Sequence, residues 1–226
     1  MLRLCVILFL SAATSAGSAT NVFVTEVLYD PVGSSESKHE FVELYNAGPA
    51  LDLQGWQIGD AVGSKAITTE HFLFDTGARL VLSEQSLSEF NARWGILLPA
   101  ANFVQVHVIP TFNNSGGDSV VLSDPNGVAV CRVDYREKAP WPGNAANASL
   151  SFTNDPRTVT PAQNNDGVNW AISVAGVAYA ITDDQGSVGS PGSVAAVPEP
   201  AAALVLIPGA LAFVSRVLLQ KRHGHS

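Results

Sequence analysis

The stretch that decides the fold reads EFVELYN at residues 40–46, followed directly by the turn residues AGP. Apolar and polar residues alternate in it, which is the period of a β-strand with one buried face. The alternation places side chains on two opposite faces, Val42 and Leu44 on one and Phe41, Glu43 and Tyr45 on the other. Asparagine, glycine and proline then favour a turn. The stretch therefore predicts a strand that ends in a tight connection.

A second stretch reads LDLQGWQIGD at residues 51–60 and continues the pattern. Its apolar residues change phase at Gln54 and Gly55, and such a slip predicts a β-bulge within a third strand. Further strand-like runs, bounded by Gly, Pro, Asn or Asp, lie at residues 22–29, 77–83, 104–109, 118–122, 128–135, 148–152 and 170–172. In the first of these runs the alternation places the odd-numbered side chains together on one face.

A helix is expected at residues 87–94, where Leu87, Phe90 and Trp94 share one side. Residues 173–181 leave two interpretations open, a late edge strand or an insertion. Many short strands with a single helical segment favour an antiparallel β-sandwich over repeated βαβ units. The expected fold class is therefore mostly β.

The order of these motifs resembles the lamin-tail domain family. The specific part is the run from Glu40 to Ile58, and the resemblance extends from about Val22 to Gly192. It implies an immunoglobulin-like β-sandwich over residues 22–192 that acts as a binding or structural module and not as an enzyme. Domains of this family also occur attached to extracellular nucleases, so an accessory role in a secreted hydrolase is the alternative.

The N-terminus has the layout of a secretory signal peptide over residues 1–19. Arg3 supplies the positive start, residues 4–10 form an apolar run, and small residues precede Ala19. The seven apolar residues of that run are too few to cross about 30 Å of hydrocarbon as a helix. Removal of the signal would leave Cys131 as the single cysteine, which we expect to be a buried small apolar residue.

The C-terminus has the layout of a membrane anchor. A linker at residues 193–200 precedes an almost wholly apolar span at residues 201–219, which would be about 29 Å long as a helix. Residues 220–226 form a basic end. Arg216, Lys221 and Arg222 carry its positive charges and favour a cytoplasmic location, which would leave the folded domain outside.

The three residues before this span are Pro198, Glu199 and Pro200. A Pro-Glu-Pro motif, an apolar helix and a basic end at the C-terminus together resemble the PEP-CTERM sorting signal. That resemblance implies recognition and cleavage by an exosortase in a Gram-negative bacterium that makes exopolysaccharide. The basic end departs from the pattern, since it is thin and continues through HGHS. A permanent single-pass anchor is the alternative.

The part of the chain that is expected to be exported differs from the two ends in its net charge. Between Thr20 and Ser193 there are 19 acidic and 8 basic residues, a net charge of −11. Such a domain would be repelled by phosphate backbones, so nucleic acid is not expected as a partner. Acidity of this kind suits an extracytoplasmic domain, with loosely held calcium as a weak alternative to having no cofactor.

Candidate chemistry within the domain is sparse. No HExxH, GxSxG, P-loop or GxGxxG motif occurs, and the histidines at 39, 71 and 107 stand in separate segments. Residues 164–167 and the pair Asp183 and Asp184 offer oxygen ligands, but these residue types are also ordinary turn formers. Trp141 lies between two prolines, where it would either stack on a sugar ring or be buried at the edge of the sandwich.

The sequence thus predicts no catalytic, cofactor or metal residues. It predicts an exported module that is held at the inner membrane and then directed to the cell surface or extracellular matrix. Exopolysaccharide or matrix proteins are its expected partners, together with the processing enzyme that reads its tail.

Overall fold

The computed structural model describes residues 21–60, 62–107 and 112–193. The expected signal segment at 1–19 and the expected apolar span at 201–219 lie outside these residues. Within the described ranges, no helix has the length and apolar character needed to cross a membrane.

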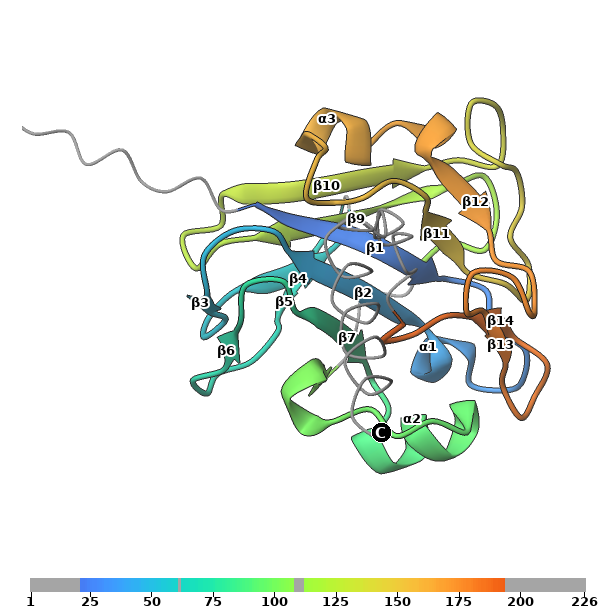
Figure 1. The fold of residues 1–226 in the computed structure, drawn as a ribbon, viewed down its shortest axis with the longest axis horizontal. Coiled ribbons are helices and arrows are strands. Elements are labelled where there is room, and N and C mark those ends of the chain that lie inside the picture. The colour runs from blue at the N-terminus through green and yellow to red at the C-terminus, as the bar shows by residue number, and fades with distance from the viewer. Residues whose placement is uncertain (1–20, 61, 108–111, 194–226) are drawn as a thin grey trace, which may run out of the picture. The chain divides into compact units, whose positions relative to one another are not determined.

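Two main sheets make up the fold (Figure 1). The larger sheet has six strands in the order β12 (Trp170–Ile172), β11 (Leu150–Phe152), β1 (Val22–Leu28), β2 (Phe41–Asn46), β7 (Arg79–Ser83) and β8 (Phe103–Gln105). The second sheet has four strands in the order β10 (Ala129–Tyr135), β9 (Asp118–Ser123), β4 (Gln57–Gly59) and β5 (Ser64–Ala66). Neighbouring strands in both sheets are antiparallel except β7 and β8, which are parallel.

Smaller elements connect and flank these sheets. Two strand pairs are formed by β3 (Leu51–Asp52) with β6 (Leu73–Phe74) and by β13 (Ile181–Thr182) with β14 (Val188–Gly189). The helices are α1 (Glu36–His39), α2 (Leu87–Trp94) and α3 (Pro161–Asn164), with single 3₁₀ turns at Ala100–Asn102 and Gly167–Asn169. The order of elements confirms a mostly β fold, consistent with an immunoglobulin-like sandwich.

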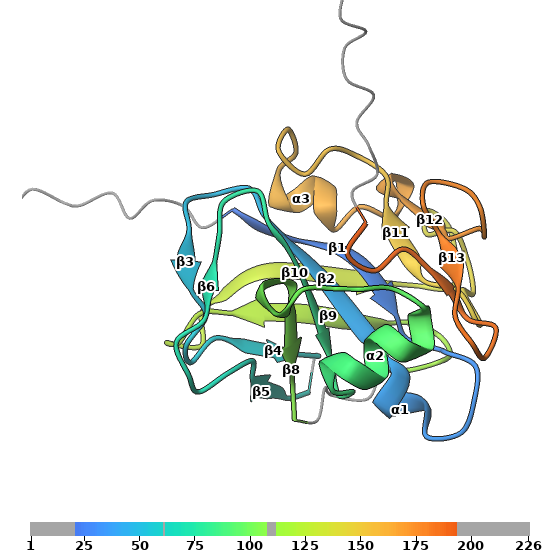
Figure 2. The ribbon, with the colours of Figure 1, turned by 60° about the horizontal axis from the view of Figure 1, so that its bottom comes forward.

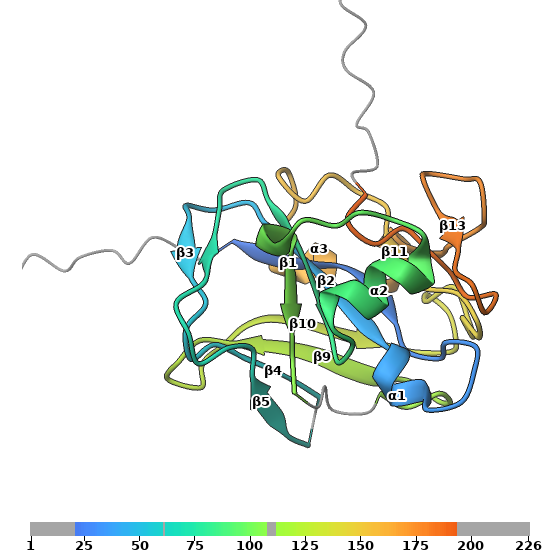
Figure 3. The same ribbon diagram turned by 90° about the horizontal axis from the view of Figure 1, so that it is seen from below.

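The sandwich core lies between the two main sheets, which Figure 3 shows one above the other. Val42 and Leu44 of β2 are fully buried in this core, together with Leu122 of β9. The rings of Tyr29 and Tyr135 stack at 4.7 Å between centroids and join the end of β1 to β10. The predicted faces of residues 40–46 are therefore confirmed.

A second apolar cluster covers the outer face of the larger sheet beneath α2. Phe41 makes edge-to-face contacts with Phe90 at 5.8 Å and with Trp94 at 5.6 Å. A capping box between Ser86 and Glu89 begins the helix, because each residue's side chain accepts from the other's backbone N–H. The predicted helix at 87–94 is confirmed, and Figure 2 shows α1 beside it.

Residues 51–60 differ from their prediction. They form two separate strands, β3 and β4, which belong to different sheets. Gly55 has φ +76, a conformation that favours glycine, and it turns the chain between the two strands. The phase slip at Gln54 and Gly55 therefore marks a change of sheet and not a bulge.

Other boundaries are also corrected. The strand expected at 104–109 ends at Gln105, and His107 lies beyond it as an exposed residue. Residues 173–180 form a turn-rich loop, and a strand begins only at Ile181, so this segment is not an edge strand of a main sheet. The short helices α1 and α3 were not expected from the sequence.

Candidate functional site

A β-bulge at Thr25 gives the outer face of β1 its polar character. The pairing register of β1 with β2 shifts between Val24 and Glu26. Val24 and Val27 both pack in the sandwich core, so the two residues between them both lie toward the outer face. The strict alternation expected from the sequence was wrong here, because it placed Thr25 and Val27 on the same face.

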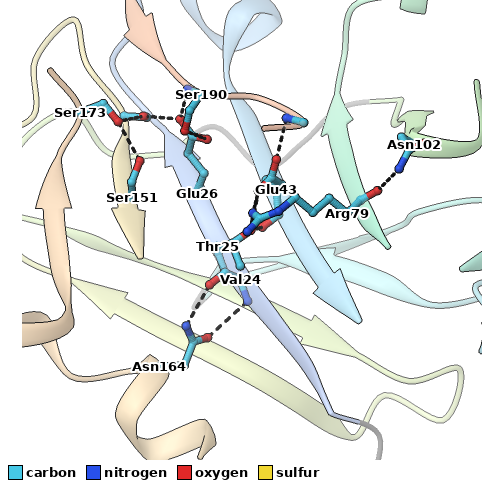
Figure 4. Close-up of polar contacts among 12 residues, drawn as sticks. Val24, Thr25, Glu26, Glu43, Arg79, Asn102, Ser151, Asn164, Ser173 and Ser190 are labelled. Carbon is cyan, nitrogen blue, oxygen red and sulfur yellow. Dashed lines mark hydrogen bonds and ion pairs between the residues drawn. The ribbon is translucent and has the colours of Figure 1, made fainter. Parts of the chain in front are cut away.

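Glu43 of β2 is the centre of the polar cluster on this face, and its side chain is 1% exposed. Its Oε1 forms an ion pair with Arg79 and accepts from the Thr25 hydroxyl at 2.7 Å. Its Oε2 accepts from the backbone N–H of Gly192 at 2.7 Å. Glu43 therefore connects its own strand β2 with the neighbouring strands β1 and β7 and with the end of the described chain (Figure 4).

Glu26 holds the same C-terminal segment at a second point. Its Oε1 accepts from the backbone N–H of Ser190 at 2.7 Å, and its Oε2 accepts from the Ser190 hydroxyl at 2.9 Å. The hydroxyl of Ser149 also donates to Oε1. The hydroxyl oxygen of Ser173 lies 2.8 Å from that of Ser149 and 2.7 Å from that of Ser151. Three serine hydroxyls thus extend the polar cluster from Glu26 to β11 (Figure 4).

The two buried carboxyl groups influence each other's protonation. Burial, and then the charge of Glu43, raise the pKa of Glu26 to about 7 against opposing hydrogen bonds from Ser149 and Ser190. Burial likewise raises the pKa of Glu43, although the Arg79 charge and donors from Thr25 and Gly192 oppose the rise. Because only Glu43 has a cation beside it, we assign the proton near neutral pH to Glu26.

A second polar clamp fixes the segment just before Ser190. Asp183 and Arg93 form a buried ion pair at 2.6 Å. Arg93 also donates to the backbone carbonyl of Val32 at 2.8 Å, and Asp183 accepts from the backbone N–H of Ser187 at 2.7 Å. The C-terminal part of the domain is thus tied to α2 and to the loop after β1.

A cavity of about 280 Å³ opens beside the carboxylate cluster. Its polar side includes Glu26, Ser151 and Ser173, and its apolar side includes Phe152 and Ile172. A concave surface that combines apolar walls with a few polar groups is typical of a ligand site. The arrangement suits binding by hydrogen bonds and apolar contact.

Trp141 does not offer a platform for a sugar ring. Its side chain is buried, with a relative exposure of 7%, and its ring lies 5.8 Å from that of Trp170. A Cβ added at Gly167 would lie 2.7 Å from Cγ of Trp141, so the backbone covers the ring closely. Of the two interpretations of Trp141, burial at the edge of the sandwich agrees with the structure, and a sugar-stacking role does not.

The residues considered for calcium take part in local structure. Asn164 bridges the backbone of Val24, accepting from its N–H at 3.3 Å and donating to its carbonyl at 2.9 Å. The carboxylate of Asp183 forms its ion pair with Arg93, as described above. Within residues 21–60, 62–107 and 112–193, no three His, Cys, Asp or Glu side chains gather in a way that could hold a metal ion.

Cys131 is buried, as expected from the sequence. Burial raises the pKa of its thiol to about 11, which keeps it protonated and unreactive at neutral pH. His39 and His71 lie in different parts of the fold, and His71 pairs with Asp52 at 2.5 Å on the surface.

The expected sorting residues Pro198, Glu199 and Pro200 lie outside the described residues, as do Arg216, Lys221 and Arg222.

Sequence reasoning missed the carboxylate cluster. Glu26, Arg79 and Ser190 come from three distant segments, and the one available signal was a pair of glutamates on neighbouring predicted strands.

Comparison with known families agrees with this architecture. The family described as Lamin Tail Domain matches residues 15–137, and the described fold continues beyond the match through β11–β14. A search of curated proteins finds no significant match. The lamin tail domain is an immunoglobulin-like structural module and not a known enzyme domain. The chain therefore belongs to the lamin tail domain family.

Proposed function

We propose that this protein is an exported, non-enzymatic binding module that is sorted to the cell surface through its C-terminal tail. The family match is the observation that carries the non-enzymatic role. Export and sorting rest on the sequence, which has a signal-like start at residues 1–19 and a Pro-Glu-Pro motif before an apolar span.

The construction of the domain supports a module that keeps its shape after transfer. Its buried acids form internal clamps, in which Glu43 pairs with Arg79 and Asp183 pairs with Arg93. Both clamps hold segments near the end of the described chain, at Gly192 and Ser187. A domain whose C-terminal segment is held by these ion pairs does not depend on a disulfide, in agreement with its free Cys131.

The proposed route places the protein first at the inner membrane. An exosortase-type enzyme would then recognise Pro198, Glu199 and Pro200, after which the domain would reach the cell surface or the extracellular matrix. Exopolysaccharide and matrix proteins are its proposed partners there.

Fractionation of the native host tests this route. Wild-type protein is expected in the surface or matrix fraction, and a variant with Pro198→Ala and Glu199→Ala is expected to stay with the inner membrane. Ser193→Ala is the matched control, because it changes a nearby residue outside the motif. Equal distribution of all three proteins would contradict the proposal.

Nuclease and phosphatase assays with added Mg²⁺ or Ca²⁺ separate the binding module from an accessory hydrolase. No turnover above the buffer control is expected. Metal-dependent turnover that co-purifies with the protein would overturn the non-enzymatic assignment.

A further inference from the structure

The cavity beside the carboxylate cluster is lined by a carboxyl group, Glu26, whose charge no described cation balances when the group is ionised. Glu26, Glu43 and Arg79 are the ionisable residues along its wall. Arg79 forms its ion pair with Glu43. Glu26 is 1% exposed and, among the described residues, receives hydrogen bonds only from the backbone and hydroxyl groups of serines. A buried carboxylate without a counter-charge is costly, so a cation entering this cavity would be stabilised.

The serine hydroxyls beside Glu26 have a defined direction. An ionised Glu26 can only accept, so the hydroxyl hydrogen of Ser149 is committed to it. Ser173 must then donate to Ser149, and Ser151 must donate to Ser173. With Ser151 as the donor to Ser173, no described residue donates to the hydroxyl oxygen of Ser151, whose lone pairs remain available at the cavity wall. The chain of hydroxyls therefore ends in an acceptor that matches a donor group on a ligand.

The remaining cavity wall is apolar and continues to the surface. Phe152, Ile172 and Val177 line it. Among the residues that line it, Val174 is 59% exposed and Val177 is 58% exposed. Ala178 and Tyr179 have φ values of +48 and +67, a strained conformation for residues other than glycine. The loop at residues 173–180 thus exposes apolar side chains while two residues other than glycine adopt a left-handed backbone conformation.

Together these features favour one chemical class of ligand. We propose that the cavity binds a primary ammonium group on an aliphatic stem, as in a lysine side chain. The ammonium group would donate to the hydroxyl oxygen of Ser151 and balance the charge of Glu26, and its methylene groups would pack along Phe152 and Ile172. This inference rests on the proposed binding role, but it does not depend on export or tail processing.

Calorimetric titration of the full-length protein with small probes tests the proposal. Butylamine is expected to bind at least about tenfold more tightly than butan-1-ol or butyrate at pH 8, since only the amine carries the required charge. Glu26→Gln is expected to remove this preference while leaving the weak binding of butan-1-ol unchanged. Equal binding of the three probes, tighter binding of butyrate to Arg79, or no binding of the amine would overturn the proposal.

A second measurement needs no variant. Because burial raises the pKa of Glu26 to about 7, most molecules carry a proton there at pH 6, and amine binding should release it. Titrations at pH 6 in two buffers of different ionisation enthalpy should therefore give different apparent heats. Identical heats would show that amine binding releases no proton at pH 6, which would contradict binding beside a protonated Glu26.

Acetylated tripeptides with a central lysine or norleucine distinguish the source of the amine. Tighter binding of the lysine peptide than of butylamine would indicate a partner protein that also covers the exposed lining residues Val174 and Val177. Equal binding would indicate a free alkylamine, and both results support the proposed chemistry. Binding of the norleucine peptide as tightly as the lysine peptide would contradict it.

Discussion

Ser190 binds Glu26 twice, through its backbone N–H at 2.7 Å and through its hydroxyl at 2.9 Å. These two residues are 164 positions apart in the sequence. The contact joins the second half of β1 to the last part of the described chain and encloses a carboxyl group that has no cation of its own. The stability of the domain should therefore depend on the protonation of Glu26.

We expect the free energy of unfolding to fall as the pH rises from about 4.5 to about 7. The pKa of Glu26 is raised from 4.5 to about 7 in the folded protein, so the folded state binds more protons than the unfolded state in this window. Stability from this group is then greatest below pH 4.5 and is lost as the pH rises through 7, by on the order of 2–3 kcal/mol. Glu40 and Asp30 also have raised pKa values, so the wild-type slope contains their contributions.

Urea denaturation of wild type and Glu26→Gln at a series of pH values isolates the Glu26 contribution. The difference in unfolding free energy between the two proteins should change across this window, because glutamine does not titrate. A difference that stays constant from pH 4.5 to pH 8 would show that Glu26 does not titrate as described.

Replacing Arg79 with methionine should destabilise the domain by about 3–5 kcal/mol at pH 7, because it leaves Glu43 buried without a cation. Adding Glu43→Gln to this variant should recover part of the loss, since the amide oxygen can still accept from Gly192. Urea denaturation of the four members of this double-mutant cycle measures the coupling.

Arg157→Met provides the matched control for this cycle. Arg157 pairs with Asp155 at 2.8 Å, but its side chain is 57% exposed, so its loss should cost less than about 1 kcal/mol. Equal effects of Arg79→Met and Arg157→Met would argue against the buried pair as a structural clamp.

Trp141→Ala should lower the free energy of unfolding by about 3–5 kcal/mol, because its ring is buried against Trp170. Val168→Ala is the control, since Val168 is 66% exposed and its truncation should change stability by less than about 0.5 kcal/mol. Thermal and urea denaturation provide the comparison. If Trp141→Ala left stability unchanged but removed binding to a glycan panel, the ring would be a ligand platform after all.

The sequence predicts those parts of the fold that rest on local rules. The α2 helix follows from the spacing of Leu87, Phe90 and Trp94 along one side, and the capping box that the structure shows between Ser86 and Glu89 is equally local. The β9–β10 hairpin follows from the turn residues DPNG at 124–127, and its observed strands agree with the expected runs within one residue. In both elements, the residues that determine the structure are close together in the chain.

The β-bulge in β1 could not be predicted in this way. The sequence VFVTEVL at residues 22–28 alternates well enough to suggest a regular strand. The bulge becomes necessary only when Val24 and Val27 must both face the core while Glu26 meets Ser190. Those demands come from packing and from a residue near the other end of the domain.

The candidate site was beyond sequence reasoning for the same reason. Glu43 meets Gly192 across 149 positions and Arg79 across 36 positions. Nothing in the local pattern near Arg79 distinguishes it from an ordinary exposed arginine at the start of a strand. Conversely, Trp141 attracted attention because prolines flank it, although its burial depends on the distant Gly167 and Trp170.

The mass of the mature C-terminus tests the central claim most directly. Protein isolated from the surface or matrix fraction of the native host should end near Pro198, Glu199 and Pro200, without the apolar span that follows. The variant with Pro198→Ala and Glu199→Ala should keep its tail, and Ser193→Ala should be processed like wild type. A surface-located protein whose mass includes an intact Ser226 would contradict the account and indicate a permanent anchor.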